Sequence, residues 1–277
     1  MQPRHRIGGY REYDPNAGAA FFCEAFWTHQ TDAGAAVAGG AHRVLPDPAL
    51  SVAYWAQRDA TGRPRRGGVV LIGPKTRPQL FPLVPGLEMA AVRLKLEWVA
   101  PVMGIDPGGI DNQIVDLSSV RSNLTDCLEE RLSHTRSALE ALPILARTIL
   151  DTRISPLAPP PAATAALEIV RRSAGRVPCH RVAGTLGISM RHLRRQVHDS
   201  AGVSPKTYAR VLRLAGAMRL ADRSRRPDWV DVALQSGYCD QSHLIRECLD
   251  LGAAPPSQLH AERASQRIDV AERSNRW

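Results

Sequence analysis

VAGTLGISMRHLRRQVH, residues 182–198, is the stretch that decides the fold of the second half of this chain. It has the pattern of a short helix, a tight turn and a second helix. Gly187 suits the turn because glycine reaches positive φ without steric cost, and Ser189 is a good N-cap for the helix that follows. Leu193 and Val197 would face a core, whereas arginines occupy the opposite side of that helix. The pattern predicts a helix-turn-helix unit with a cationic outer face.

The same arrangement recurs in WVDVALQSGYCDQSHLIR, residues 229–246. Gly237 supplies the turn, and Asp240 is placed to cap the second helix of this unit. The inner face of that helix would hold Leu244 and Cys248. The helix before the turn is expected to bury Val230, Ala233 and Leu234.

A connecting helix is predicted between the two units. Ser204 and Pro205 suit its N-cap and its first helical position, and apolar residues continue through Leu220. One helix of this length would hold the two units at a fixed distance. Two helix-turn-helix units with basic outer faces on one chain indicate a protein that binds double-stranded DNA.

The outward-facing polar residues of the two second helices are the candidate DNA contacts. Arginine donates two parallel hydrogen bonds to O6 and N7 of guanine in the major groove, so G-rich steps are expected in the first half of the DNA site. A merely solvated arginine surface is the alternative interpretation of the same residues. The predicted DNA-binding residues are Arg191, Arg194, Arg195 and His198 on the first helix, and Gln241, Ser242, His243 and Arg246 on the second.

Several short segments in this half match the pattern of one known family. The matching segments are Leu186-Gly187-Ile188-Ser189, Gly202-Val203-Ser204-Pro205 with Tyr208, Arg213-Leu214, and Gly237-Tyr238 with Asp240-Gln241-Ser242-His243-Leu244. Together they resemble the DNA-binding domain of the AraC/XylS family of bacterial transcription regulators. The resemblance implies a sequence-specific regulator, activator or repressor, that inserts two recognition helices into successive major-groove segments of a promoter. The sequence departs from the family at Val197, Leu244 and Cys248, where the family usually has aromatic residues.

Cationic side chains are concentrated in the second half of the chain. The net charge is +9, and residues 1–160 hold 17 Arg and Lys against 16 Asp and Glu, whereas residues 161–277 hold 19 against 11. Cations near phosphates release condensed counterions, so this half should bind DNA in a salt-sensitive way. No apolar run has the length of a membrane span, and residues 1–10 lack a signal-peptide core. We therefore expect a cytoplasmic, nucleoid-associated protein without membrane contact.

The five cysteines are scattered without the spacing of a metal site, so we expect free thiols, no metal and no cofactor. VPCHRV at residues 177–182 nevertheless reproduces the active-site string of O6-alkylguanine-DNA alkyltransferases. The alternative function is therefore a DNA alkyltransferase or alkylation sensor that uses Cys179 as its alkyl acceptor. Such an enzyme needs its own fold and a base-flipping pocket around the cysteine, and a helix-turn-helix start supplies neither. We expect no enzymatic activity.

The first half has a different pattern. Short β-type runs separated by Pro, Gly and Asp predict an antiparallel β-rich, barrel-like domain. A short helix is expected over residues 98–103, followed by a helical hairpin over 117–152 that is interrupted near Pro143. The fold class is α+β, with this domain and its helical connector before an all-α domain that has two helix-turn-helix motifs joined by a long helix. The expected strands are Phe21–Trp27, His42–Leu45, Leu50–Trp55, Val69–Ile72, Gln79–Val84 and Met89–Leu96.

These patterns divide the chain into four segments. They are a β-rich sensing or dimerisation domain over 1–153, a Pro-rich linker over 154–163, a DNA-binding domain over 164–260 and a flexible tail over 261–277. The first segment resembles the N-terminal domain of an actinobacterial-type branch of AraC-like regulators. Segments that carry this resemblance are Tyr10-Arg11-Glu12-Tyr13, Arg43-Val44-Leu45-Pro46-Asp47 and Gly73-Pro74-Lys75-Thr76. It implies a sensory or pairing role, and it leaves a small-molecule effector, RNA polymerase and a second copy of the chain open as partners besides DNA.

Overall fold

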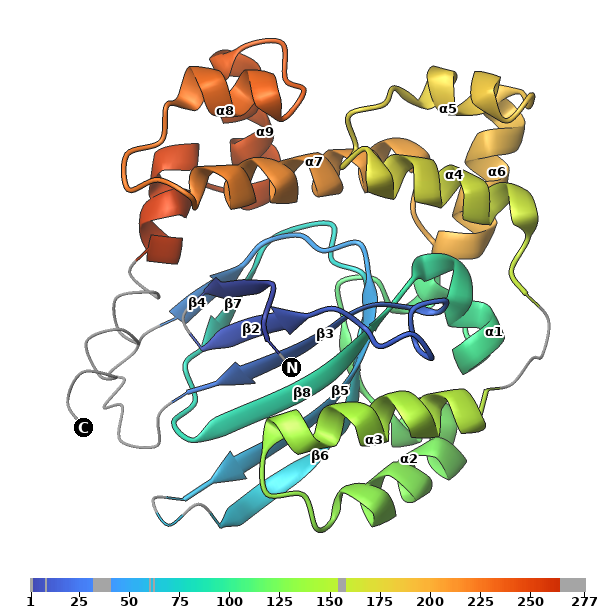
Figure 1. Cartoon of the computed structure of the whole chain (residues 1–277), viewed down its shortest axis with the longest axis vertical. Coiled ribbons are helices and arrows are strands. Elements are labelled where there is room, and N and C mark those ends of the chain that lie inside the picture. Colours follow the sequence, from blue (N-terminus) through green and yellow to red (C-terminus); the bar gives the residue numbers. More distant parts are fainter. Residues whose placement is uncertain are drawn as a thin grey trace.

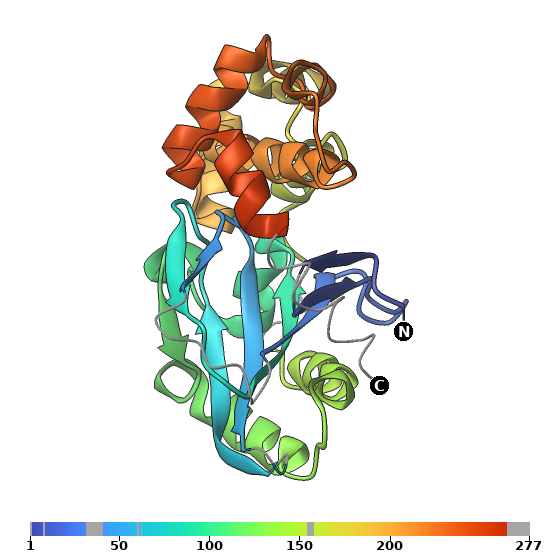
Figure 2. The same cartoon turned by 90° about the vertical axis from the view of Figure 1, so that its left-hand side faces the viewer.

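The computed structural model describes residues 2–7, 9–31, 41–59, 61, 63–153 and 158–264. In Figure 1 an antiparallel β-rich N-terminal part lies below an all-helical C-terminal part, which confirms the predicted α+β fold class. The view at 90° in Figure 2 shows the helical part stacked on one end of the sheet. No helix among the described residues is long and apolar enough to cross a membrane.

The strands of the N-terminal part are β1 (His5–Ile7), β2 (Tyr10–Tyr13), β3 (Cys23–Gln30), β4 (Ala41–Val44), β5 (Leu50–Arg58), β6 (Pro64–Ile72), β7 (Gln79–Pro82), β8 (Leu87–Leu94) and β9 (Ile114–Asp116). One antiparallel sheet has the order β1-β2-β3-β8-β5-β6-β9, and β4 pairs with β7 in a separate ribbon. Within the described part of the chain this order is open, so the sheet is not a closed barrel. The sequence did not predict β1, β2 and β9, because these short segments do not alternate apolar and polar residues.

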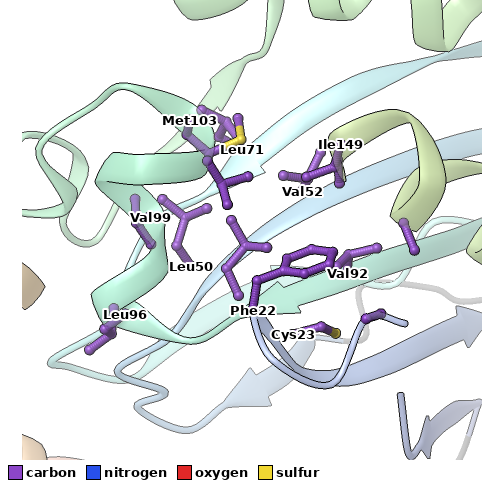
Figure 3. Close-up of a cluster of buried hydrophobic side chains, with 14 of the residues drawn as sticks. Phe22, Cys23, Leu50, Val52, Leu71, Val92, Leu96, Val99, Met103 and Ile149 are labelled. Carbon is purple, nitrogen blue, oxygen red and sulfur yellow. The ribbon is translucent and has the colours of Figure 1, made fainter. Parts of the chain in front are cut away.

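One face of the sheet packs against α2 (Ser118–Leu132) and α3 (Ala138–Asp151). The short helices η1 (Leu96–Trp98), α1 (Val99–Met103) and η2 (Pro107–Ile110) contact the helical C-terminal part. The short helix predicted over 98–103 is present, and Gly104 ends it with φ of 70°. Side chains of the strands and of the helices meet in the core shown in Figure 3, among them Leu50, Val52, Leu71, Val92, Val99, Met103 and Ile149.

The predicted helical hairpin is present, but its interruption is not near Pro143. The turn lies between α2 and α3, where the hydroxyl of Ser137 accepts a hydrogen bond from the backbone N–H of Glu140 and caps α3. Pro143 lies inside α3 on its exposed side. There it removes only the hydrogen bond that its missing N–H would have donated, and the packing of the hairpin on the sheet keeps the helix continuous.

The helices of the C-terminal part are α4 (Pro161–Arg172), α5 (Cys179–Thr185), α6 (Met190–Ala201), α7 (Pro205–Ala221), α8 (Trp229–Gln235) and α9 (Gln241–Gly252). The linker prediction was wrong for residues 161–163, because Pro161 is the first residue of α4, a position where proline loses no hydrogen bond. Residues 154–157 lie outside the described residues. The tail prediction was wrong for 261–264, since these residues are helical, Glu262 pairs with Arg43 and Arg263 pairs with Asp222. Residues 265–277 lie outside the described part of the chain.

The N-terminal part and the first helix-turn-helix unit share one buried core. Glu97 of η1 has a side chain only 1% exposed and accepts hydrogen bonds of 2.8 and 3.0 Å from Nη2 of Arg171 on α4. The backbones of Gly202 and Gly108 touch, because a Cβ added to Gly202 would lie 2.3 Å from the nitrogen of Gly108. The first unit is therefore docked on the N-terminal part through apolar, ionic and backbone contacts.

The second unit touches the N-terminal part at the β4–β7 ribbon. Leu45 packs against the buried cluster of this unit. Arg43 on β4 donates a hydrogen bond of 3.2 Å to the carbonyl of Gly252 at the end of α9, and it pairs with Glu262 at 2.9 Å. Both helix-turn-helix units thus contact the N-terminal part, at separate places.

Candidate nucleic-acid interface

The first unit consists of α5, a turn and α6, as predicted. Gly187 has φ of 64° in the turn, and the backbone N–H of Ile188 donates to the carbonyl of Ala183 at 3.0 Å. Ser189 then starts α6, because its hydroxyl accepts a hydrogen bond of 3.2 Å from the N–H of His192. These local bonds fix the direction in which α6 leaves the turn.

The two faces of α6 are as the spacing predicted. Leu193 and Val197 are buried in the core of the unit. Arg191, Arg194 and Arg195 are exposed, and no carboxylate in the described part of the chain lies within ion-pair distance of them. His198 is also exposed and has only a distant contact, with its Nδ1 3.9 Å from Oδ1 of Asp199. Three guanidinium groups on this face are therefore available to an external anion.

The second unit consists of α8, a turn and α9. Asp228 caps α8 by accepting from the N–H groups of Val230 and Asp231 at 2.9 and 3.2 Å. Gly237 has φ of 80° in the turn, and Asp240 caps α9 by accepting from the N–H of His243 at 2.6 Å.

The buried stripe predicted for α8 was partly wrong. Val230 and Leu234 are 51% and 58% exposed, whereas Val232 and Ala233 are buried. A helix of seven residues makes only two turns, so its apolar spacing does not decide which of two overlapping stripes faces the core. The contacts with α7 and α9 decide it instead.

The predicted DNA-binding residues of α9 differ in their exposure to solvent. Ser242 and Arg246 are exposed, whereas Gln241 and His243 are half-buried. The imidazole of His243 packs edge to face on the ring of Tyr238, with the ring centroids 5.2 Å apart. All eight predicted residues thus lie on α6 and α9. On α9, Ser242 and Arg246 are the most exposed of the four.

The connecting helix α7 joins the two units rigidly. Ser204 caps it by accepting from the N–H of Thr207 at 3.0 Å, and Pro205 is its first residue, as predicted. α7 packs against α4 and α6 toward one end and against α8 and α9 toward the other. Arg210 on α7 forms ion pairs with Glu247 and Asp250 on α9, the former at 3.0 Å. Its 17 residues span about 25 Å at 1.5 Å per residue.

A groove of about 460 Å³ lies beside α6 where α5, α6 and α7 meet. Cys179 lines it and is half-buried. Burial raises the pKa of the Cys179 thiol above its ordinary value, although Arg213, Arg194 and Lys206 act in the opposite direction. A raised pKa reduces the thiolate that an alkyl acceptor needs, so this geometry does not favour the alkyltransferase alternative. Sequence reasoning singled out Cys179 but missed Lys206 and Arg213 beside it.

Metal binding has no support within the described residues, which contain no cluster of three or more His, Cys, Asp or Glu side chains able to hold an ion. All five cysteines are free thiols.

Comparison with known proteins agrees with this geometry. A protein-family model described as a helix-turn-helix domain matches residues 182–262. Comparison with curated proteins gives no match. Among solved structures, a transcriptional regulator with an AraC-type DNA-binding domain from Chromobacterium violaceum is 24% identical, with a TM-score of 0.34; the match covers 38% of this chain and 93% of that one.

Two further solved structures are similar. The C-terminal domain of AraT, a response regulator from Geobacillus stearothermophilus, is 21% identical over 38% of this chain and 87% of its own, with a TM-score of 0.35. ToxT from Vibrio cholerae, in an unsaturated fatty acid bound form, is 12% identical over 96% of this chain and 99% of its own, with a TM-score of 0.44. All three TM-scores lie below 0.5, and the support for DNA binding comes from the helix-turn-helix match over residues 182–262 and from the arrangement of α5 to α9.

Proposed function

We propose that this chain is a DNA-binding transcription regulator of the AraC type that inserts α6 and α9 into successive major-groove segments of a promoter. The helix-turn-helix family match over residues 182–262 supports this proposal. The observation that carries the proposal is the pair of exposed polar helix faces held by α7. Successive major-groove segments on one side of DNA are about 34 Å apart. A connecting helix of about 25 Å, with a recognition helix beyond each end, suits that spacing.

The base contacts in this proposal come from Arg191, Arg194, Arg195 and His198 on α6 and from Gln241, Ser242, His243 and Arg246 on α9. The α6 arginines would donate paired hydrogen bonds to guanine, so the half of the site under α6 is G-rich. Ser242 and Arg246 would make the contacts under α9, with His243 held against Tyr238 at the edge. The excess positive charge of residues 161–277 would add salt-sensitive attraction to phosphates.

The N-terminal part has a sensing or pairing role in this proposal. It contacts both helix-turn-helix units, so an effector or a second copy of the chain bound there can change how the units are held. The chain would act at the nucleoid in the cytoplasm, alone or with RNA polymerase, by binding and not by catalysis. It would need no cofactor.

Selection of binding sites from random duplex DNA by the purified full chain tests the proposed function. The expected result is an enriched motif with two half-sites about one helical turn apart, the first of them G-rich. A triple variant, Arg191→Ala with Arg194→Ala and Arg195→Ala, should lose the first half-site and keep the second. Enrichment of no motif by the wild-type chain would overturn the proposal.

A further inference from the structure

The groove beside α6 carries a group of cationic side chains on an otherwise largely apolar lining. Arg194, Lys206 and Arg213 line it, and none of its lining residues is acidic. Lys206 is exposed, and no carboxylate in the described part of the chain lies within ion-pair distance of any of these three cations. All three line the same groove as the Cys179 thiol. An unneutralised group of three cations favours an anion as its occupant.

Arg213 connects the groove to the second unit. Its guanidinium lies over the ring of Tyr238, 5.4 Å from the centroid, and Tyr238 packs in turn on His243 of α9. Nε of Arg213 and the hydroxyl of Tyr238 are buried without a hydrogen-bond partner among the described residues. A chain of contacts therefore runs from the groove beside α6 through Arg213, in the middle of α7, and the buried Tyr238 to His243 near the start of α9.

Sugar-phosphate strands have to cross the region between the two recognition helices if α6 and α9 occupy successive segments of the major groove. Between two such segments the minor groove faces the protein, and the strands on its two sides carry one negative charge per phosphate. The groove is continuous with the proposed recognition helix through Arg194 and Met190, which both line it. The groove thus offers an anion-binding site at a place where the duplex presents a backbone phosphate.

We propose that the groove between α5, α6 and α7 binds a backbone phosphate of the DNA strand that crosses from one recognition helix to the other, with Lys206 and Arg213 as its ligands. This inference rests on the proposed DNA-binding function and adds a contact that neither recognition helix makes. A phosphate held there fixes the register of both helices on the duplex and carries no sequence information itself.

The variant Lys206→Gln tests the phosphate contact without disturbing the fold, because Lys206 is exposed in the first turn of α7. Affinity for the selected duplex and for a random duplex is measured as a function of salt concentration. The slope of log affinity against log salt should fall by about 0.9, the value for one phosphate contact, and both duplexes should lose affinity by the same factor. Arg136→Gln, which removes an equally exposed charge from the N-terminal part, is the matched control and should leave the slope unchanged.

Cys179 gives a second measurement on the unmodified chain. Alkylation by iodoacetamide is followed by peptide mass with and without saturating selected duplex. DNA should slow the reaction of Cys179 severalfold but leave Cys127 on α2, which is also half-buried, unaffected.

An unchanged salt slope for Lys206→Gln, together with unprotected Cys179 in a saturated complex, would overturn the phosphate site while leaving the proposed function in place. Loss of affinity for the selected duplex alone would also overturn it, because a phosphate contact does not distinguish sequences. Failure of the wild-type chain to bind either duplex would overturn both proposals.

Discussion

Arginines in this chain fall into two groups that composition does not separate. Arg171, Arg210 and Arg263 pair with carboxylates in the protein, and Asp222, the partner of Arg263, has a side chain only 4% exposed. The α6 arginines are exposed and have no carboxylate partner among the described residues. A guanidinium already bound to a buried carboxylate would have to break that pair to reach DNA, which costs several kcal/mol. The unpaired arginines are therefore the ones available for recognition.

Arg195 tests the base-contacting role at the residue scale. In Arg195→Ala, binding to the selected duplex should weaken by about 1 to 3 kcal/mol and specificity should relax at one base pair, because one paired hydrogen-bond donor to a base is lost. Competition binding with single-base variants of the site measures both effects. A loss of the same size on random duplex DNA would assign Arg195 to a phosphate instead.

His29 makes stability depend on pH. Burial, and then the neighbouring His42 with its ring centroid 5.6 Å away, lower the pKa of His29 to about 4. The unfolded chain takes up this proton near pH 6.5 and the folded chain only near pH 4, so stability is complete above pH 6.5 and declines as pH falls from 6.5 towards 4. At pH 5 the loss from this residue should be about 2 kcal/mol.

Urea unfolding at pH 7 and pH 5 measures this contribution. The variant His29→Gln should lose less stability than the wild-type chain between the two pH values. Glu12 affects stability over a different pH range. Arg93 and Arg4 lower the pKa of its carboxyl group to about 2, so its contribution to the free energy of unfolding is lost only below about pH 4.5. An identical pH dependence in His29→Gln and the wild-type chain would assign the decline to other groups.

At the scale of single elements, helix ends follow from local chemistry. Ser189, Ser204 and Asp240 were predicted as N-caps and each accepts a hydrogen bond from the backbone N–H three residues later. Such a bond needs no distant partner, which is why a sequence pattern is enough to predict it. The buried side of α8 depends on helices that pack against it, and there the same pattern was wrong for Val230 and Leu234.

Two glycines distinguish the cost of a positive φ from the cost of a steric clash: Gly175 lies between α4 and α5, and Gly187 lies in the turn of the first unit. Gly175 and Gly187 both have positive φ, 72° and 64°. A Cβ on Gly187 meets nothing within 4 Å, whereas a Cβ on Gly175 would lie 2.0 Å from the carbonyl oxygen of Ala209 on α7. Gly187→Ala should therefore cost about 1 to 2 kcal/mol of unfolding free energy, and Gly175→Ala about 2 to 5, since it also pushes α7 away. Denaturant unfolding of the two variants compares these costs, and equal losses would contradict the close contact with α7.

At the scale of the whole molecule, the two predicted domains are not separate bodies. One buried cluster runs from the sheet through η1 and α1 into α4, α5 and α6, and the second unit is tied to β4 by Arg43. Cooperative unfolding of the N-terminal part with the first helix-turn-helix unit is the expected consequence. The docking also leaves the predicted DNA-facing residues of α6 exposed, so it is compatible with DNA binding.

The ion pair between Glu97 and Arg171 tests this docking. Arg171 has two carboxylate partners, Glu97 across the interface and Glu168 on its own helix, whose side chains are 1% and 44% exposed. Glu97→Gln leaves a nearly buried guanidinium without its buried partner and should cost about 3 to 5 kcal/mol. Glu168→Gln removes an exposed pair and should cost less than about 1 kcal/mol. Calorimetric unfolding of both variants measures the difference, and similar small losses would mean that the interface does not depend on this pair.

The sequence by itself determined the α+β division, the two helix-turn-helix units, their turns and caps, and the eight residues proposed to contact DNA. These features depend on interactions between residues within about four positions of each other, or on the residues that share one face of a helix. Both can be predicted from the spacing of residue types along the sequence. Only the tertiary structure decided that the domains share a core, that α4 begins at Pro161, and that Lys206 and Arg213 meet Cys179 in one groove. Arg171 and Glu97 are 74 residues apart and Arg43 and Glu262 are 219 apart, and no local pattern relates such pairs. Folding brings them together because apolar packing sets η1 beside α4 and the β4–β7 ribbon beside the end of α9.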